Sequence, residues 1–211
     1  ALGLPTWLSR FDFVLDVNGN LRMVELNADT PCFLIESYYA NEVAANYVGR
    51  KHPNIECRKE LHTFLKRMYD VVLSAKYGRN QYESMRANRE SLPKDPFVFS
   101  CFHDYFEDYG TTQFLMKELK TACPEADTRF ISFYDMKIDD EGIPLEDGSH
   151  AALLYRLHPM ELLIDEQTPD NEPLGEMFLD LYEENRFALF NPPESIILQN
   201  KSFMSLVYAL Y

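Results

Sequence analysis

The sequence predicts a mixed α/β fold in which an antiparallel hairpin precedes a small layer of parallel strands and helices. Two alternating runs at 10–15 and 21–26 flank an Asn-Gly pair, which is typical of a tight hairpin turn. Further along, apolar runs at 97–102, 128–134 and 151–157 are separated by helical or turn-rich stretches. Strand, helix, strand, strand in this order is typical of an α/β layer with right-handed crossovers.

Length and charge limit the class of protein. The chain has 211 residues, of which 46% are hydrophobic, so it can form one large domain or two small ones with a substantial core. Its formal net charge of −14 argues against a general binder of nucleic acid or of an anionic membrane, because both surfaces would repel it. A local basic pocket for phosphate stays compatible with this charge.

The cysteines and the apolar runs indicate a cellular compartment, and the chain ends indicate a fragment. No apolar run has transmembrane length and no signal peptide is recognisable. The four cysteines lack any CxxC or zinc-type spacing, so we interpret them as reduced thiols in a cytoplasmic protein. The chain begins without Met and stops inside a helical pattern, so we expect an interior fragment of a longer protein.

The hairpin carries the first candidate site. Folding the chain at the Asn-Gly turn places Asp12 roughly opposite Glu25, with Asn27 at the same end. Two carboxylates and an amide suit a hard cation such as Mg²⁺. Arg10 lies two residues from Asp12 on the same face, where it can meet an anionic oxygen. The alternative is a solvated polar face followed by an Asn-Ala-Asp-Thr-Pro turn.

Two helices are expected after the hairpin. Apolar residues spaced by three and four predict a helix over 33–48, and a stronger apolar stripe predicts a second one over 58–77. Gly78 is a natural stop for the second helix. The polar stretch 79–96 predicts a loop or a short helix ending in a linker, and it supplies the best internal boundary.

The α/β layer begins at 97–102, a continuous apolar run that suits a buried parallel strand. A helix is expected over 111–122, followed by strands at 128–134 and 151–157 with a turn-rich excursion at 137–147 between them. The remaining expected elements are a helix over 174–185, a short strand over 187–190 and a last helix over 195–211.

Charged residues at the strand ends give further candidates. The stretch 103–112 is a predicted loop that follows the first strand of the layer. It lies at the carboxyl end of that strand, where open α/β sheets usually bind ligands. Its Glu107 and Asp108 suit an amine or a polar substrate, or they simply favour a helix N-terminus through the dipole. Arg156 and Glu161 follow the third strand, and we expect them to pair with each other or face solvent rather than line the cleft.

The other signals are weaker. A lysine near the start of a helix goes against the dipole preference, so Lys201 in the stretch 195–211 is either a contact for a ligand anion or an ordinary exposed lysine. The five histidines are dispersed, and no HExxH, GxSxG or Walker A motif occurs.

Three stretches resemble the glutathionylspermidine synthase family of ATP-grasp-type carboxylate–amine ligases. RFDF…VELNADTP resembles the family signature, and LYRLHPMELLIDE and FNPPESIILQNKSFMSLVYAL resemble two later segments in the same order. The resemblance implies an ATP-grasp-like metal hairpin with helices at 1–93 and a small pre-ATP-grasp α/β layer at 94–165. It also implies a helical return into a truncated ATP-grasp region at 166–211.

The resemblance also implies roles for individual residues. It implies Asp12, Glu25 and Asn27 as Mg²⁺ ligands, and Arg10 as the catalytic cation that stabilises the transferring phosphate or acyl phosphate. It implies that Lys201 contacts the phosphates of ATP. The implied substrate contacts are Thr30, Cys32, Glu107 and Asp108.

The implied function is ATP- and Mg²⁺-dependent amide-bond formation between a small-molecule carboxylate and an amine, through an acyl phosphate. The sequence departs from the family pattern where Cys32 replaces a serine, and where His158 and Met160 replace aromatic residues. The family's nucleotide-closing V-K-P…G region does not occur, so we expect this piece to be inactive alone and its hairpin to be metal-free. The alternative function is a non-catalytic module that binds a nucleotide or an amine. The oligomeric state and the two substrates stay open.

Overall fold

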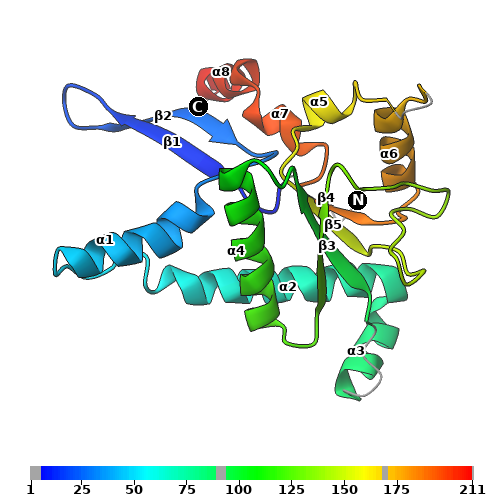
Figure 1. Cartoon of the computed structure of the whole chain (residues 1–211). Coiled ribbons are helices and arrows are strands. Elements are labelled where there is room, and N and C mark those ends of the chain that lie inside the picture. The colour runs from blue at the N-terminus through cyan, green and yellow to red at the C-terminus, as the bar shows by residue number, and fades with distance from the viewer. Residues whose placement is uncertain (1–5, 89–93, 168–170, 211) are drawn as a thin grey trace.

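The computed structural model describes residues 6–88, 94–167 and 171–210 (Figure 1). At the centre of this part of the chain lies a parallel sheet of four strands in the order β4-β3-β5-β6. Its members are β3 (Pro96–Cys101), β4 (Asp127–Ser132), β5 (Leu153–Arg156) and β6 (Ala188–Phe190). The mixed α/β class is confirmed, and so is the parallel layer predicted from the apolar runs.

The apolar run of β3 explains its central position. All six of its residues are buried, which requires cover on both faces of the sheet. Because side chains alternate along a strand, Phe97 and Phe99 enter one core and Val98 enters the other. The first core includes α2 (Cys57–Tyr77) and α4 (Phe106–Ala122), and the second includes α5 (Met160–Leu163) and α6 (Leu174–Glu183).

The helices after the hairpin agree with their apolar spacing. A π-helical segment, η1 (Glu36–Ala40), continues into α1 (Asn41–Tyr47), inside the helix predicted at 33–48. The stronger stripe forms α2, which ends at Gly78 with a φ of 80°. The polar stretch after it forms α3 (Arg79–Ala87), while residues 89–93 of the predicted linker lie outside the described part. The division into parts at 93 and 165 therefore stays a prediction.

Two predicted boundaries are wrong. Helix α4 begins at Phe106, five residues before the expected start, so most of the predicted loop 103–112 is helical. Glu107 and Asp108 in the first turn favour this start, since acidic side chains stabilise the positive end of a helix. The single helix expected over 195–211 is instead α7 (Ser195–Gln199) and α8 (Lys201–Leu210). Asn200 separates them with an extended backbone conformation.

The hairpin projects beside the parallel layer as a separate two-stranded sheet (Figure 1). It consists of β1 (Arg10–Leu15) and β2 (Leu21–Asn27), which pair antiparallel around the predicted turn. Helix α7 packs against β2, and the hydroxyl of Tyr208 in α8 donates to the Met23 carbonyl at 3.4 Å. Among the helices described, none is long and apolar enough to cross a membrane.

Candidate functional site

The pairing of β1 with β2 brings the predicted metal ligands together. Asp12 lies directly opposite Glu25, and Arg10 lies directly opposite Asn27. Residues two apart on a strand share a face, and directly opposed residues share it across the strands. All four side chains therefore belong to one face at the base of the hairpin, as the sequence predicts for this end.

Contacts on this face centre on Asp12. The Arg10 guanidinium donates to both Asp12 carboxylate oxygens, at 2.8 and 2.9 Å, and the Asn27 amide lies 3.5 Å from one of them. The hydrogen bonds from Arg10 lower the pKa of Asp12, so its carboxylate stays ionised. Lys201, at the start of α8, places its ammonium nitrogen 3.8 Å from a Glu25 oxygen while keeping most of its own side chain exposed.

The donor set on this face fits a hard divalent cation. Its oxygens come from two carboxylates and one amide, which suits Mg²⁺ with its few protein ligands and retained waters. Within residues 6–88, 94–167 and 171–210, no group of three or more His, Cys, Asp and Glu side chains is arranged to hold a metal. The metal hypothesis thus depends on the amide of Asn27 as a third ligand. It also requires Asp12 to share or exchange its contacts with Arg10.

A second group of predicted residues lies at the start of α4. The Cys32 thiol donates to Asp108, with 3.7 Å between the sulfur and the carboxylate oxygen, and it also lies 3.8 Å from the Thr30 carbonyl oxygen. Burial raises the pKa of Cys32 to about 11, and the nearby Asp108 carboxylate adds to this shift. Burial likewise raises the pKa of Asp108. The two acidic residues therefore differ: Asp108 is half-buried and contacts Cys32, whereas Glu107 is exposed to solvent.

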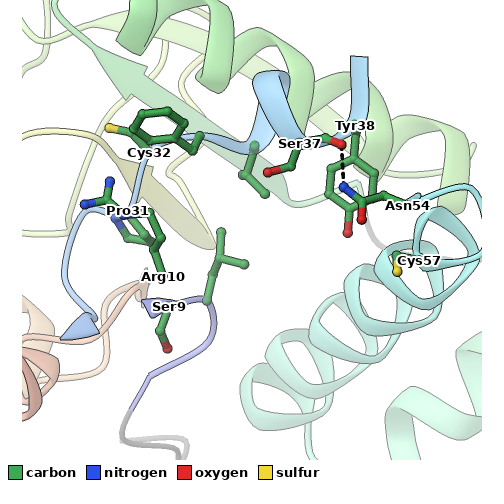
Figure 2. A pocket seen from close by; sticks show the side chains of 11 residues that line it. Ser9, Arg10, Pro31, Cys32, Ser37, Tyr38, Asn54 and Cys57 are labelled. Atoms are coloured by element: carbon green, nitrogen blue, oxygen red, sulfur yellow. Dashed lines mark hydrogen bonds between the residues drawn. The ribbon is translucent and has the colours of Figure 1, made fainter. Parts of the chain in front are cut away.

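A pocket of about 320 Å³ adjoins both groups (Figure 2). Arg10 and Cys32 lie at one end, and the Arg10 guanidinium carbon is 5.2 Å from the centre of the Phe33 ring. At the other end the Asn54 amide donates to the Ser37 carbonyl at 2.7 Å. The pocket thus runs from the base of the hairpin to the N-terminus of α2. Its polar lining includes Ser9, Arg10, Cys32, Tyr38, Asn54 and Cys57.

The sequence interpretation missed a buried ion pair between Asp29 and Arg156. Arg156 does not pair with Glu161 or face solvent as expected, because its side chain is fully buried and binds the Asp29 carboxylate. Glu161 is exposed. The sequence did contain one signal, because Arg156 lies at the end of an apolar strand. A charge buried there requires a partner of opposite charge. Nothing in the sequence around Asp29 indicated that it is this partner, because the stretch also suits an ordinary turn.

A model of the family described as glutathionylspermidine synthase preATP-grasp matches residues 3–211. The chain belongs to the glutathionylspermidine synthase family. The match spans nearly the entire chain and confirms the resemblance found in three separate stretches. The description assigns residues 3–211 as a whole to a pre-ATP-grasp domain, and membership in this ligase family supports a ligase-related role with small-molecule substrates.

Proposed function

We propose that this chain carries part of the active site of an ATP- and Mg²⁺-dependent carboxylate–amine ligase. The observation that carries the proposal is the shared hairpin face of Arg10, Asp12, Glu25 and Asn27 in a member of a ligase family. Ligation would convert the acid into an acyl phosphate by transfer of the terminal phosphoryl group of ATP. The amine would then attack the acyl carbon and release phosphate.

The hairpin residues would serve the phosphoryl-transfer half of this reaction. Asp12, Glu25 and Asn27 would hold Mg²⁺, which neutralises charge on the phosphates of ATP when bound. Arg10 is held by Asp12 and lies near the Phe33 ring, so its cation is oriented before substrate arrives. Such a preorganised charge stabilises negative charge that develops on the transferring group. Lys201 would add a second cation, because its exposed side chain makes one long contact with Glu25.

The residues at the start of α4 would serve the substrate half. Asp108 and Glu107 would offer carboxylates to an amine, and Thr30 and Cys32 would contact the substrate from the segment after β2, where Cys32 donates to Asp108. The net charge of −14 would draw a cationic amine toward the protein from solution. The acid would bind in the pocket beside Arg10, with its carboxylate facing this cation.

The proposal is tested by replacing a metal ligand and a matched control. Glu25→Gln removes one ligand charge, and Glu83→Gln removes a comparable exposed carboxylate that pairs with Arg79 on α3. In the intact protein we expect Glu25→Gln to weaken Mg²⁺-dependent ATP binding and amine-dependent ATP hydrolysis, with Glu83→Gln behaving as wild type. Equal nucleotide binding and turnover in wild type and Glu25→Gln would contradict the metal assignment.

A second candidate is a module that binds a nucleotide or an amine without ligation. It is favoured by the contacts of Asp12, whose two carboxylate oxygens are both engaged by Arg10. Under this alternative, ATP or an amine would bind but no phosphate would be released in the presence of acid and amine. Measuring binding and phosphate release on the same preparation separates the two candidates.

A further inference from the structure

The segment that follows β2 docks at the end of the parallel sheet where open α/β sheets usually bind ligands. The chain passes from β3 to β4 on one side and returns to β5 on the other, so the strand order reverses between β3 and β5. Ligands of open α/β sheets bind outside the strand ends at such a reversal. Here Asp29 contacts Arg156, the last residue of β5, and Cys32 contacts Asp108 at the start of α4. The protein's own segment therefore lies across these strand ends.

Asp29 is the most heavily bonded residue of this segment. Its carboxylate accepts two hydrogen bonds from the Arg156 guanidinium and one from the Met160 amide at 2.8 Å. Its own amide donates to the Gln199 side chain at 3.2 Å. The side chains of Asp29 and Arg156 are 1% and 0% exposed, so water does not compete for these contacts.

Asn191 extends the network to the segment before β1. Its side-chain amide donates to the Asp29 carbonyl at 3.1 Å and to the Leu8 carbonyl at 2.8 Å. Its side-chain oxygen accepts from the Trp7 and Leu8 amides at 2.7 and 2.9 Å. Both ends of the hairpin are consequently bonded to one buried polar cluster, defined by Asp29, Arg156 and Asn191.

Stability alone does not account for this cluster. Removing two charges from water is costly, and well-packed apolar residues in place of a buried ion pair are often equally or more stabilising. Among the described residues, none forms a hydrogen bond with the Arg156 Nε, which adds to the cost of burying this guanidinium. A directional, bidentate contact does what apolar packing cannot, because it fixes the relative orientation of two elements.

We propose that Asp29 and Arg156 are positioning residues that hold the hairpin at a fixed place relative to the start of α4. Their role in ligation rests on the proposed function, although the positioning does not. Asp29 is two residues from Asn27 on the metal side and three from Cys32 on the substrate side. At roughly 3.5 Å per extended residue, each group lies within about 7–11 Å of this anchor along the chain. A displaced anchor therefore changes the separation between the two halves of the site.

The single tryptophan is a native reporter of this anchoring. Trp7 lies three residues before the hairpin begins and is 9% exposed. Its ring stacks on Phe190, and its backbone N–H donates to the Asn191 side chain. Loss of the anchor should expose it, which shifts its emission to longer wavelength and raises its quenching by acrylamide severalfold. This readout requires neither substrate nor nucleotide, so it is independent of the proposed function.

The test compares Asp29→Asn, Arg156→Met and the double variant with wild type. Each single variant leaves one buried group without its partner, so we expect lower stability and an exposed Trp7. The double variant removes both charges, so its urea midpoint should recover toward the wild-type value while Trp7 stays exposed. Asp70→Asn is the control, because Asp70 pairs with Arg86 at a site that is more exposed than the Asp29–Arg156 pair. This variant should leave Trp7 protected.

The kinetic arm uses the same substitutions in the intact protein, in an ATP-dependent ligation assay. A misplacement of about 1 Å can cost about 100-fold in rate, so kcat should fall by up to about that factor while the KM for ATP changes little. Arg156→Lys keeps the charge but not the bidentate contact, and it should give an intermediate result in both readouts. Full protection of Trp7 in the double variant, or in Asp29→Asn, would overturn the positioning role. Absence of ligation in the intact wild-type protein would overturn only the proposed function.

Discussion

The Cys32 sulfur lies 3.7 Å from a carboxylate oxygen of Asp108, and this contact joins the segment after the hairpin to the first turn of α4. Burial and the facing carboxylate raise the pKa of the thiol to about 11. At neutral pH the sulfur is therefore protonated and acts as a hydrogen-bond donor. A thiol in this state is a poor nucleophile, which argues against covalent chemistry at Cys32.

The first prediction concerns the reactivity of this thiol. Only the thiolate reacts with iodoacetamide, so Cys32 should be alkylated much more slowly than a free cysteine at pH 8. Its alkylation rate should rise steeply between pH 9 and 11, as the thiol ionises. Asp108→Asn removes the facing charge and should lower the pKa of Cys32 and speed the reaction at pH 8. Peptide mass spectrometry reports each cysteine separately. Alkylation of Cys32 at the free-cysteine rate in wild type would contradict its raised pKa.

The second prediction concerns the Arg10–Asp12 pair. The hydrogen bonds from Arg10 lower the pKa of Asp12, so the pair contributes stability above the ordinary carboxyl pKa of about 3.9. That contribution is lost as the pH falls through the lowered pKa of the folded state. Arg10→Met should return the Asp12 titration, followed by NMR of the side-chain carboxyl carbon, toward its ordinary value. Arg79→Met removes an exposed arginine from α3 and should leave this titration unchanged. An unaltered Asp12 midpoint in Arg10→Met would show that the pair does not control this ionisation.

The third prediction concerns the packing of α6 on the turn after α5. A Cβ atom at Gly175 would lie 2.4 Å from the Ile164 Cα and 2.5 Å from the Leu163 carbonyl oxygen, so backbone would have to move. Gly175→Ala should therefore destabilise the protein by about 1–3 kcal/mol, as overpacking does. Urea unfolding followed by circular dichroism measures the change.

Gly110 in α4 supplies the matched control. A Cβ atom there would meet the end of the Ile35 side chain at an ordinary 3.6 Å. Alanine also favours a helix over glycine, so Gly110→Ala should be neutral or stabilising by up to about 1 kcal/mol. Equal effects of the two substitutions would mean that backbone crowding at Gly175 does not matter.

Short-range patterns were sufficient to predict much of the fold. The alternation around the Asn-Gly turn predicted the hairpin and the opposition of Asp12 to Glu25, because a tight turn fixes which residues face each other. The apolar run of β3 similarly predicted a fully buried parallel strand. These features depend on residues close in sequence or on burial on both faces, and both leave a visible periodicity.

Features that depend on distant partners were not predicted. Asp29 and Arg156 are 127 residues apart, and neither residue's neighbours indicate that the other will satisfy its charge. The boundary at Asn200 was missed for a different reason. The apolar spacing continues across it, so periodicity favoured one helix where a capping side chain makes two.

The fourth prediction follows from that cap. The Asn200 side-chain oxygen accepts hydrogen bonds from the Ser202 amide at 2.8 Å and the Phe203 amide at 3.4 Å, which satisfies free donors at the start of α8. Asn200→Ala should cost about 1 kcal/mol and increase hydrogen exchange in the first turn of α8. It should also loosen the contact of Lys201 with Glu25, because Lys201 is the first residue of that turn.

Asn80 is the control for this substitution, because it is an exposed asparagine within α3. Asn80→Ala should be neutral or slightly stabilising, since alanine has the higher helix propensity. Unchanged hydrogen exchange at the start of α8 in Asn200→Ala would mean that packing against the hairpin, rather than the cap, fixes this end of the helix. Lys201 would then keep its place beside Glu25 without help from Asn200. If Asn200 does cap the helix, Asn200→Ala should lose both the exchange protection and the position of Lys201.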